Sequence, residues 1–330
     1  MRDLIIYIIL AIIGYFAGCR LREHNRLRQF AGKVQIAAIV VLLVFMGMRM
    51  GANEEVTENL RSIGLISVCL TLLVMLFSGI AAGAARYVLG MDRRARIRQG
   101  KQDGYPLLQA GSSSGGESET GGSQKLMAVL ILISVTAGML MGYFLVPDIF
   151  AGKMDLFDSC AGLAVNSGLY ILLLLIGYNM GLDGTVIENF KKVGARIILF
   201  PFIVMAGAFL AACFCTFFMN ISVKEALAVT AGFGWYSLAP GIILEAGLAR
   251  CAAISFMHCI MREYFSLLLV PVVAKKVGYM EAVGICGATA MGVCLPIVER
   301  STRSDVVIYS FISGIIHTVS VPILIPLLVG

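Results

Sequence analysis

Charge is scarce in this sequence of 330 residues. Asp, Glu, Lys and Arg together make up 14% of it, against about 25% in ordinary soluble domains. Apolar residues make up 59% of the chain, and its mean hydropathy is +0.89. Such a composition excludes a soluble globular protein and predicts an all-α polytopic membrane protein. At about 20 residues per span plus loops, the length allows roughly eight to ten spans.

Several motifs are missing as well. The sequence has no Walker A pattern, Rossmann glycine triplet, nucleophile elbow or HExxH, so ATP-driven transport and soluble-type catalysis have no support. Its nine cysteines form no CxxC pair, and its three histidines do not cluster with them. We therefore expect a protein that is not an enzyme, with no metal and no cofactor.

The net charge of +6 does not indicate a nucleic-acid partner, because the basic residues lie between the apolar runs. Basic loops near residues 20–33 and 86–101 alternate with acidic loops near 54–58 and 148–158. Loops rich in Lys and Arg face the cytoplasm. The pattern predicts a multi-pass inner-membrane protein, in contact with the lipid bilayer, with its N-terminus outside.

The apolar runs divide the chain into four parts. A Gly- and Ser-rich stretch has nothing to bury and is typical of a flexible linker. The predicted parts are a three-helix N-terminal membrane module at 1–98, a cytoplasmic linker at 99–125, a three-helix scaffold at 126–224, and two hairpin-plus-helix units at 225–330 that form the transport site.

An internal repeat supports this division. Residues 47–64 match residues 177–194 without a gap, at an offset of 130, with identical Gly, Met, Glu and Asn positions. Three spans is an odd number, so the second copy lies upside down relative to the first. Inverted-topology repeats of this kind are typical of secondary transporters.

The last third is interpreted as two re-entrant broken hairpins, at 225–247 and 279–298. Both contain Gly and Pro, and the hairpin interpretation keeps Lys275 and Lys276 on the cytoplasmic side. A weak repeat at offset 55 would make two hairpin units of opposite orientation that meet tip to tip. The prediction is about eight transmembrane helices plus two hairpins; ten crossing helices is the alternative.

The first broken stretch contains the residues that we expect to bind substrate. Irregular backbone at membrane depth survives only inside protein or beside a wet cavity, and transporters often bind substrate there. The aromatic side chains could hold an ammonium by cation–π attraction, and Glu245 could serve as a carboxylate for a cation or a proton site. Thr289 belongs to the second hairpin. The expected substrate-binding residues are Gly232, Gly234, Trp235, Tyr236, Ser237, Glu245 and Thr289.

Charged residues inside membrane spans are costly in lipid, so we expect each of them to have a functional role. Arg262 and Glu263 fall in the middle of an apolar run and, with Glu245, are the expected coupling or ion-pair residues. Adjacent helical residues point about 100° apart, so Arg262 and Glu263 do not simply neutralise each other. Arg49 is interpreted as a side chain that extends to the outer surface.

The strings Gly-Phe-Gly-Trp-Tyr-Ser at 232–237 and Cys-Gly-Ala-Thr-Ala-Met at 286–291, with Arg262-Glu263 between them, resemble the bacterial lysine exporter family LysO. The resemblance implies export of L-lysine and of toxic lysine analogues, against an inward proton flux. Where that family commonly has an Asp after the Met, this sequence has Gly292, and another expected acid is replaced around His258 and Cys259.

The expected function is therefore a secondary active exporter of L-lysine or a related cationic amino acid, coupled to protons by antiport. In this hypothesis Arg262 replaces the substrate on the return step, with Glu263 holding it. A passive amino-acid channel, an exporter of a different small amino acid or analogue, an intramembrane enzyme and a non-transporting sensor are the alternatives. The sequence leaves a homodimer open.

Overall fold

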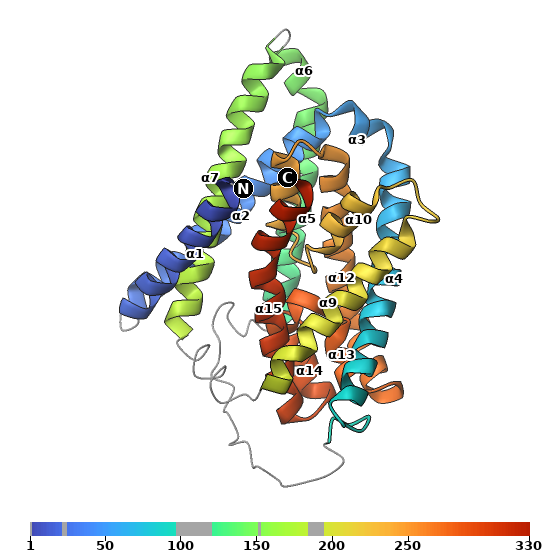
Figure 1. The fold of residues 1–330 in the computed structure, drawn as a ribbon. Coiled ribbons are helices and arrows are strands. Elements are labelled where there is room, and N and C mark those ends of the chain that lie inside the picture. The colour runs from blue at the N-terminus through green and yellow to red at the C-terminus, as the bar shows by residue number, and fades with distance from the viewer. Residues whose placement is uncertain (1, 22–24, 97–120, 151–152, 184–194) are drawn as a thin grey trace.

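The structure is a computed structural model that describes residues 2–21, 25–96, 121–150, 153–183 and 195–330. Every regular element in these ranges is helical, as predicted (Figure 1). The elements are α1 (Arg2–Arg20), α2 (Asn25–Gly51), α3 (Glu54–Glu58), α4 (Leu60–Val88), α5 (Gly121–Phe144), α6 (Val146–Ile149), α7 (Met154–Asp183), α9 (Ala195–Cys215), α10 (Val223–Thr230), α11 (Ala239–Glu245), α12 (Ala249–Lys276), α13 (Tyr279–Gly284), the 3₁₀ helix η1 (Gly287–Met291), α14 (Leu295–Ser301) and α15 (Ser304–Val329).

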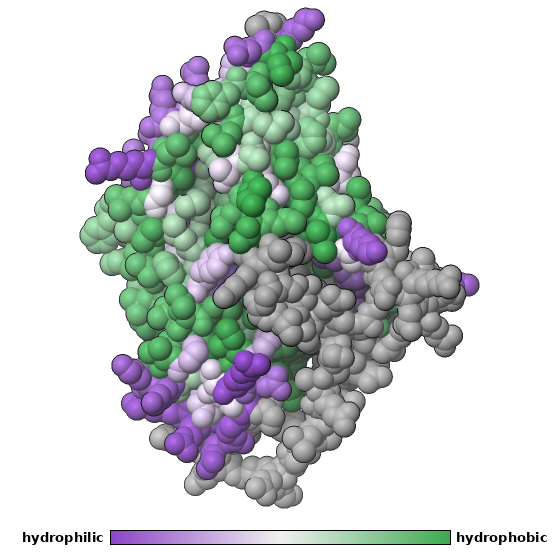
Figure 2. Space-filling model, turned by 180° about the vertical axis from the view of Figure 1, so that it is seen from behind, coloured by the Kyte–Doolittle hydropathy of each residue, from purple (hydrophilic) through white to green (hydrophobic). Residues whose placement is uncertain are grey.

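The surface has the character of a membrane protein. Figure 2 shows a broad hydrophobic zone with hydrophilic residues gathered toward the two ends of the molecule. Within the described ranges, six helices are long and apolar enough to cross a membrane, namely those at 31–51, 60–88, 154–179, 197–215, 249–276 and 306–329. The apolar helices at 5–20 and 129–144 are shorter. The prediction of an all-α polytopic protein is confirmed.

Two helix pairs on one side of the molecule pack closely through glycines. On the α1–α7 interface, a Cβ on Gly14 would lie 2.1 Å from the Leu174 carbonyl oxygen, and one on Gly18 would lie 2.0 Å from that of Tyr178. Residue numbers therefore rise together along the two helices, which makes α1 and α7 parallel. Gly47 and Gly51 of α2 contact α5 in the same way, at Val135 and Met139, so these two helices are also parallel.

Other helix pairs run in opposite directions. Between α2 and α7, Leu42 lies beside Gly168 while Arg49 lies beside Gly162, so these helices are antiparallel. Between α4 and α9, the ring of Phe77 packs against Phe214, while a Cβ on Gly207 would touch Ala81, so this pair is antiparallel too. The order of these contacts gives the relative directions of α1, α2, α5 and α7, and separately those of α4 and α9.

Part of the predicted organisation falls outside the described residues. Most of the predicted linker, at 97–120, lies there, and α5 already begins at Gly121, before the expected residue 126. The second copy of the sequence repeat spans residues 177–194, and its later part, 184–194, lies outside the described ranges as well.

The last third contains two interrupted segments. The first interrupted segment, residues 223–245, consists of α10, a non-helical turn and α11; the second, residues 279–301, consists of α13, η1 and α14. Figure 1 shows α10 toward the upper end of the molecule, and α13 and α14 toward the lower end. The long α12 joins them, and α15 follows the second segment.

The residues that flank each interrupted segment lie near each other. The guanidinium of Arg250, at the start of α12, donates to the Asn220 carbonyl just before α10, 3.1 Å away. At the other end, the Tyr279 amide donates to the Arg93 carbonyl at 3.0 Å, and Arg303 lies close enough to the same loop to act electrostatically on Asp92.

Candidate functional site

The tips of the two interrupted segments meet. The amide of Ala288 donates a hydrogen bond to the carbonyl of Phe233 at 2.9 Å, which joins one segment to the other through the backbone. Three residues at this meeting point have left-handed backbone: Phe233 with φ of 48°, Gly234 with 100° and Gly287 with 65°. We call the contact of residues 233–234 with residues 287–289 the junction.

Local sequence explains the break in the first segment. Helix α10 starts with a capping box, in which the Ser222 hydroxyl accepts from the Glu225 amide and the Glu225 carboxylate accepts from the Ser222 amide. Helix α11 has Pro240 in its first turn, where proline's missing N–H costs no hydrogen bond. Between them, Gly234 takes a backbone conformation that side-chain-bearing residues rarely adopt.

A glycine is also required in the second segment. A Cβ on Gly287 would lie 2.5 Å from the Phe233 carbonyl oxygen and 2.8 Å from Cζ of Arg262. The positive φ and the lack of space act together here, so the close approach of the two segments depends on this residue.

Arg262 lies fully buried beside the junction. Its Nε donates to the Ile285 carbonyl at 3.1 Å, and its Nη2 donates to the Ser78 hydroxyl of α4 at 3.4 Å. Its Nη1 has no hydrogen-bond partner among the described residues. A guanidinium at membrane depth costs about 2.5–3.5 kcal/mol on insertion scales, so it is an expensive group to retain.

The other predicted residues near the junction have mainly local partners. The indole N–H of Trp235 donates to the Ser237 hydroxyl at 3.0 Å. The Thr289 hydroxyl donates to the Cys286 carbonyl at 2.8 Å, and its Cγ2 would lie 3.5 Å from a Cβ on Gly234. Gly232 packs against Ala239 and Cys259, where a Cβ would not fit.

Glu263 lies beside Tyr236. The two side chains line a small cavity against Ile131 and Leu132 of α5, with a volume of about 10 Å³. Such a volume is about that of one water-sized sphere. The structure records no ion pair between Arg262 and Glu263, so the groups that hold Arg262 are the Ile285 carbonyl and the Ser78 hydroxyl instead.

Glu245 lies at the far end of α11 from the junction, in a separate polar cluster. It forms an ion pair with Arg49 of α2, and its Oε2 accepts a hydrogen bond from the Asn166 amide of α7 at 2.5 Å. Gly162 of α7 lies beside both charged groups, since a Cβ there would be 3.7 Å from Nη1 of Arg49 and 3.8 Å from the Glu245 carboxylate. The sequence had suggested that Arg49 extends to the outer surface, and this interpretation is wrong. Arg49 instead links the N-terminal helices to the first interrupted segment.

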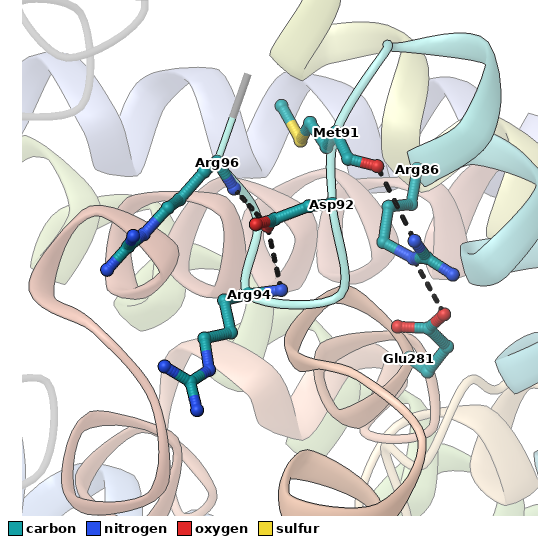
Figure 3. Close-up of polar contacts among 6 residues, drawn as sticks. All are labelled: Arg86, Met91, Asp92, Arg94, Arg96 and Glu281. Carbon is teal, nitrogen blue, oxygen red and sulfur yellow. Dashed lines mark hydrogen bonds and ion pairs between the residues drawn. The ribbon is translucent and has the colours of Figure 1, made fainter. Parts of the chain in front are cut away.

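A second ion pair was missed by the sequence analysis. Glu281 of α13 is 4% exposed, and its Oε1 accepts from Nε of Arg86, on α4, at 2.8 Å (Figure 3). Arg86 also donates to the Met91 carbonyl at 3.4 Å. In the sequence, Glu281 stands two residues after Tyr279 in an apolar run, and nothing near it marks it as buried. The only available signal was an acid close to two lysines.

The loop that follows α4 is folded around Asp92. One carboxylate oxygen of Asp92 accepts from the Arg94 amide at 2.9 Å and from the Arg96 amide at 2.7 Å (Figure 3). The hydrogen bond from Arg96 is the largest cause that lowers the pKa of Asp92 below its usual 3.8. This loop and the Arg86–Glu281 pair hold the start of the second interrupted segment against α4.

Two buried histidines also lie on helices that reach the junction. His258 of α12 contacts the Thr71 hydroxyl at 2.9 Å through Nδ1. His317 of α15 packs its ring edge-on against Phe233, with ring centroids 4.8 Å apart. Neither Nε2 atom has a hydrogen-bond partner within the described ranges. Buried polar atoms are nearly always paired, with protein groups or with ordered water.

Comparison with known proteins decides the family. The sequence profile described as "Lysine exporter LysO" matches residues 132–329, which include both interrupted segments and the junction. The chain belongs to the lysine exporter LysO family. A family of lysine exporters is a family of transporters, and with the apolar helices it implies an integral inner-membrane protein.

Two curated LysO relatives are similar over about half of this chain. The "Lysine exporter LysO" of Escherichia coli (strain K12) is 28% identical over 157 residues, which are 48% of this chain and 52% of that protein. The "Putative lysine exporter" of Haemophilus influenzae (strain ATCC 51907 / DSM 11121 / KW20 / Rd) is 29% identical over 164 residues, 48% of this chain and 82% of that protein. The chain thus spans about half the length of the first relative. No solved structure matches.

Proposed function

We propose that this protein exports L-lysine or a related cationic amino acid across the inner membrane by proton antiport. The observation that carries the proposal is the junction itself, where two interrupted segments from opposite ends of the molecule meet beside a fully buried arginine. Broken helices at mid-membrane depth are typical of substrate sites in secondary transporters. Membership in a lysine exporter family supports this assignment.

The two interrupted segments are proposed to be re-entrant hairpins. Each would begin and end at one end of the molecule, and their tips touch through the Ala288 to Phe233 hydrogen bond. Irregular backbone is tolerated within a membrane only when it is enclosed by protein or lines a wet cavity. The α10–α11 and α13–α14 units, each with the long helix that follows it, would form the moving part.

The helices before residue 216 are proposed to form an inverted repeat that acts as the scaffold. Because α1 is parallel to α7, α7 is antiparallel to α2, and α2 is parallel to α5, helices α1 and α5 run in opposite directions. The same contacts make α2 and α7 opposite, and α4 and α9 are opposite as well. Equivalent glycines support the repeat, since Gly47 and Gly51 match Gly177 and Gly181 at the offset of 130.

Substrate binding is assigned to the groups around the junction. Gly232, Gly234 and Thr289 shape the backbone there, and the Trp235, Tyr236 and Ser237 side chains offer aromatic and hydroxyl surfaces to an ammonium group. Glu245 would act at a second position, because α11 sets it about 9 Å along the helix from Ala239. There Arg49 holds the place that a substrate cation would take.

Coupling is assigned to the acidic groups and to Arg262. Glu263 would carry the proton, since it lines a cavity with room for about one water. Arg262 would keep a positive charge at the junction when no substrate is bound, held by the Ile285 carbonyl and the Ser78 hydroxyl.

The test is efflux of labelled lysine from vesicles that contain the purified full chain. We expect efflux to accelerate when protons are more concentrated on the side that receives lysine. Efflux that ignores the pH gradient would favour a passive channel. The absence of lysine efflux, with labelled arginine, ornithine and neutral amino acids also retained, would overturn the assignment.

A further inference from the structure

Arg262 differs from Arg49 and Arg86, two other arginines that lie partly inside the molecule. Arg49 and Arg86 each form an ion pair with a glutamate. The fully buried guanidinium of Arg262 has only two neutral partners, the Ile285 carbonyl and the Ser78 hydroxyl. In the part of the chain that the structure describes, no carboxylate forms an ion pair with it. The charge is buried without an anion.

The unpartnered part of this guanidinium is Nη1, which has no hydrogen-bond partner within the described residues. The Arg262 side chain lies at the junction, because a Cβ on Gly287 would be 2.8 Å from its Cζ and a Cβ on Gly234 would be 3.8 Å from its Cδ. A buried cation with an unused donor is unstable in a dry site unless an anion or water supplies the missing partner.

Other unpaired polar atoms lie on the elements that form the junction. His317, whose ring packs on Phe233, has an unpartnered Nε2, and Thr230, at the last residue of α10, has an unpartnered hydroxyl. Such groups are expected to be satisfied in a native structure, by protein or by something bound. Together with Arg262 they favour a polar ligand over an apolar one.

We propose that Nη1 of Arg262 binds the α-carboxylate of the exported amino acid. This inference rests on the proposed function and adds a requirement to it: the substrate must carry a free carboxylate next to its cationic groups. A planar guanidinium pairs with a carboxylate by strong, directed, charge-assisted hydrogen bonds. Diamines and amino-acid amides, which keep the ammonium groups but lack the carboxylate, are then poor substrates.

The junction is closed in this structure, so the carboxylate reaches Nη1 only after the tips of the two segments separate. The bond from Ala288 to Phe233 and the tight contact of Gly287 with Arg262 hold them together. Carboxylate binding would therefore favour an open junction, because the ligand stabilises only the state in which its partner is exposed.

The experiment compares lysine with two analogues as competitors of labelled lysine transport in vesicles containing the full chain. L-lysinamide keeps both amino groups and loses the carboxylate charge, and 1,5-diaminopentane lacks the carboxyl carbon entirely. We expect both to compete at least about 10-fold more weakly than lysine, the effect of losing a charge-assisted hydrogen bond. Equal competition by lysine and lysinamide would overturn the inference, and would leave water or an inorganic anion as the partner of Nη1.

Variants of Arg262 test whether the preference for a carboxylate depends on this residue. In Arg262→Gln the lysine affinity should fall about 10- to 100-fold while that of diaminopentane stays constant, so the preference for a carboxylate disappears. Arg262→Lys should restore part of it. Ser266→Ala is the matched control, because Ser266 donates to the same Ile285 carbonyl at 3.3 Å but leaves the charge, and it should keep the preference. A preference that survives in Arg262→Gln would contradict the proposal.

The wild-type comparison needs no variant, so it tests the inference even if Arg262→Gln fails to fold. It also separates two failures. If wild-type vesicles transport no lysine at all, the proposed function is wrong and this subsite is lost with it. If they transport lysine but accept lysinamide equally well, export stands and only the role of Arg262 is refuted.

Discussion

Nε of Arg86 lies 2.8 Å from Oε1 of Glu281, and this ion pair joins α4 to the first turn of the second interrupted segment. The first interrupted segment is tied in the same manner at its last residue, where Glu245 pairs with Arg49 of α2. Each segment is thus held, near its own end of the molecule, to the N-terminal helices by one arginine–glutamate pair.

Loss of the Arg86 charge should destabilise the fold. Glu281 is 4% exposed, and Arg86→Met would leave its carboxylate buried without a counter-ion, at a cost of about 3–5 kcal/mol. Thermal unfolding of the purified protein in detergent measures this. Arg300→Met, on the exposed face of α14, is the control and should change stability by less than about 0.5 kcal/mol. Equal unfolding temperatures for the two variants would contradict the structural role of the pair.

Glu245→Gln should abolish export without unfolding the protein. The amide keeps the shape of the side chain and can still interact with Asn166, but it removes the charge that faces Arg49. Vesicle efflux of labelled lysine measures the loss, and Glu299→Gln, a change of the same kind on an exposed residue of α14, should export normally. Normal efflux by the Glu245 variant would refute the assignment.

Gly287→Ala should be far more damaging than Gly292→Ala. At Gly287 the backbone has φ of 65°, which strains a residue with a Cβ by roughly 1–3 kcal/mol, and the new methyl would overlap Phe233 and Arg262. At Gly292, only five residues away, a Cβ meets nothing within 4 Å. Unfolding temperature and lysine efflux should both fall in the first variant alone. Similar behaviour of the two would show that the junction is not closely packed.

The loop around Asp92 should open at acidic pH. Its pKa is lowered in the folded protein from 3.8, so its hydrogen bonds contribute stability that is fully present above pH 3.8 and is lost as the pH falls through the lowered pKa. Hydrogen exchange of the Arg94 and Arg96 amides reports this directly. Protection should disappear on acidification in the wild type and be missing at every pH in Asp92→Ala; protection that persists in that variant would assign it to other contacts.

The sequence predicted the helices well and the charged contacts poorly. The helix expected after each predicted hairpin corresponds to α12 at 249–276 and to α15 at 304–329, because hydropathy over some twenty residues is a strong signal. The break at Gly234 was also predictable, since glycines and a proline interrupt an apolar run there.

Partners of buried charges could not be predicted. Arg49 and Glu245 are 196 residues apart in the chain, and Arg86 and Glu281 are 195 apart. No local pattern connects residues at such a distance, so Arg49 was interpreted as a surface side chain and Glu281 passed unnoticed. Helical geometry indicated that Arg262 and Glu263 do not simply neutralise each other, yet Glu263 was still expected to hold Arg262. The actual partners of Arg262, Ile285 and Ser78, required the fold.

The central claim is that each interrupted segment enters and leaves the membrane on one side. Single cysteines at Asn220, Ala246, Lys275 and Glu299, in a background without the nine native ones, test it with a membrane-impermeant maleimide applied from either side. All four positions are exposed; Asn220, Ala246 and Lys275 flank the segments, and Glu299 lies in the last turn of the second one. We predict that Asn220→Cys and Ala246→Cys react from one side, and that Lys275→Cys and Glu299→Cys react from the other. Labelling of positions 220 and 246 from opposite sides would contradict the account.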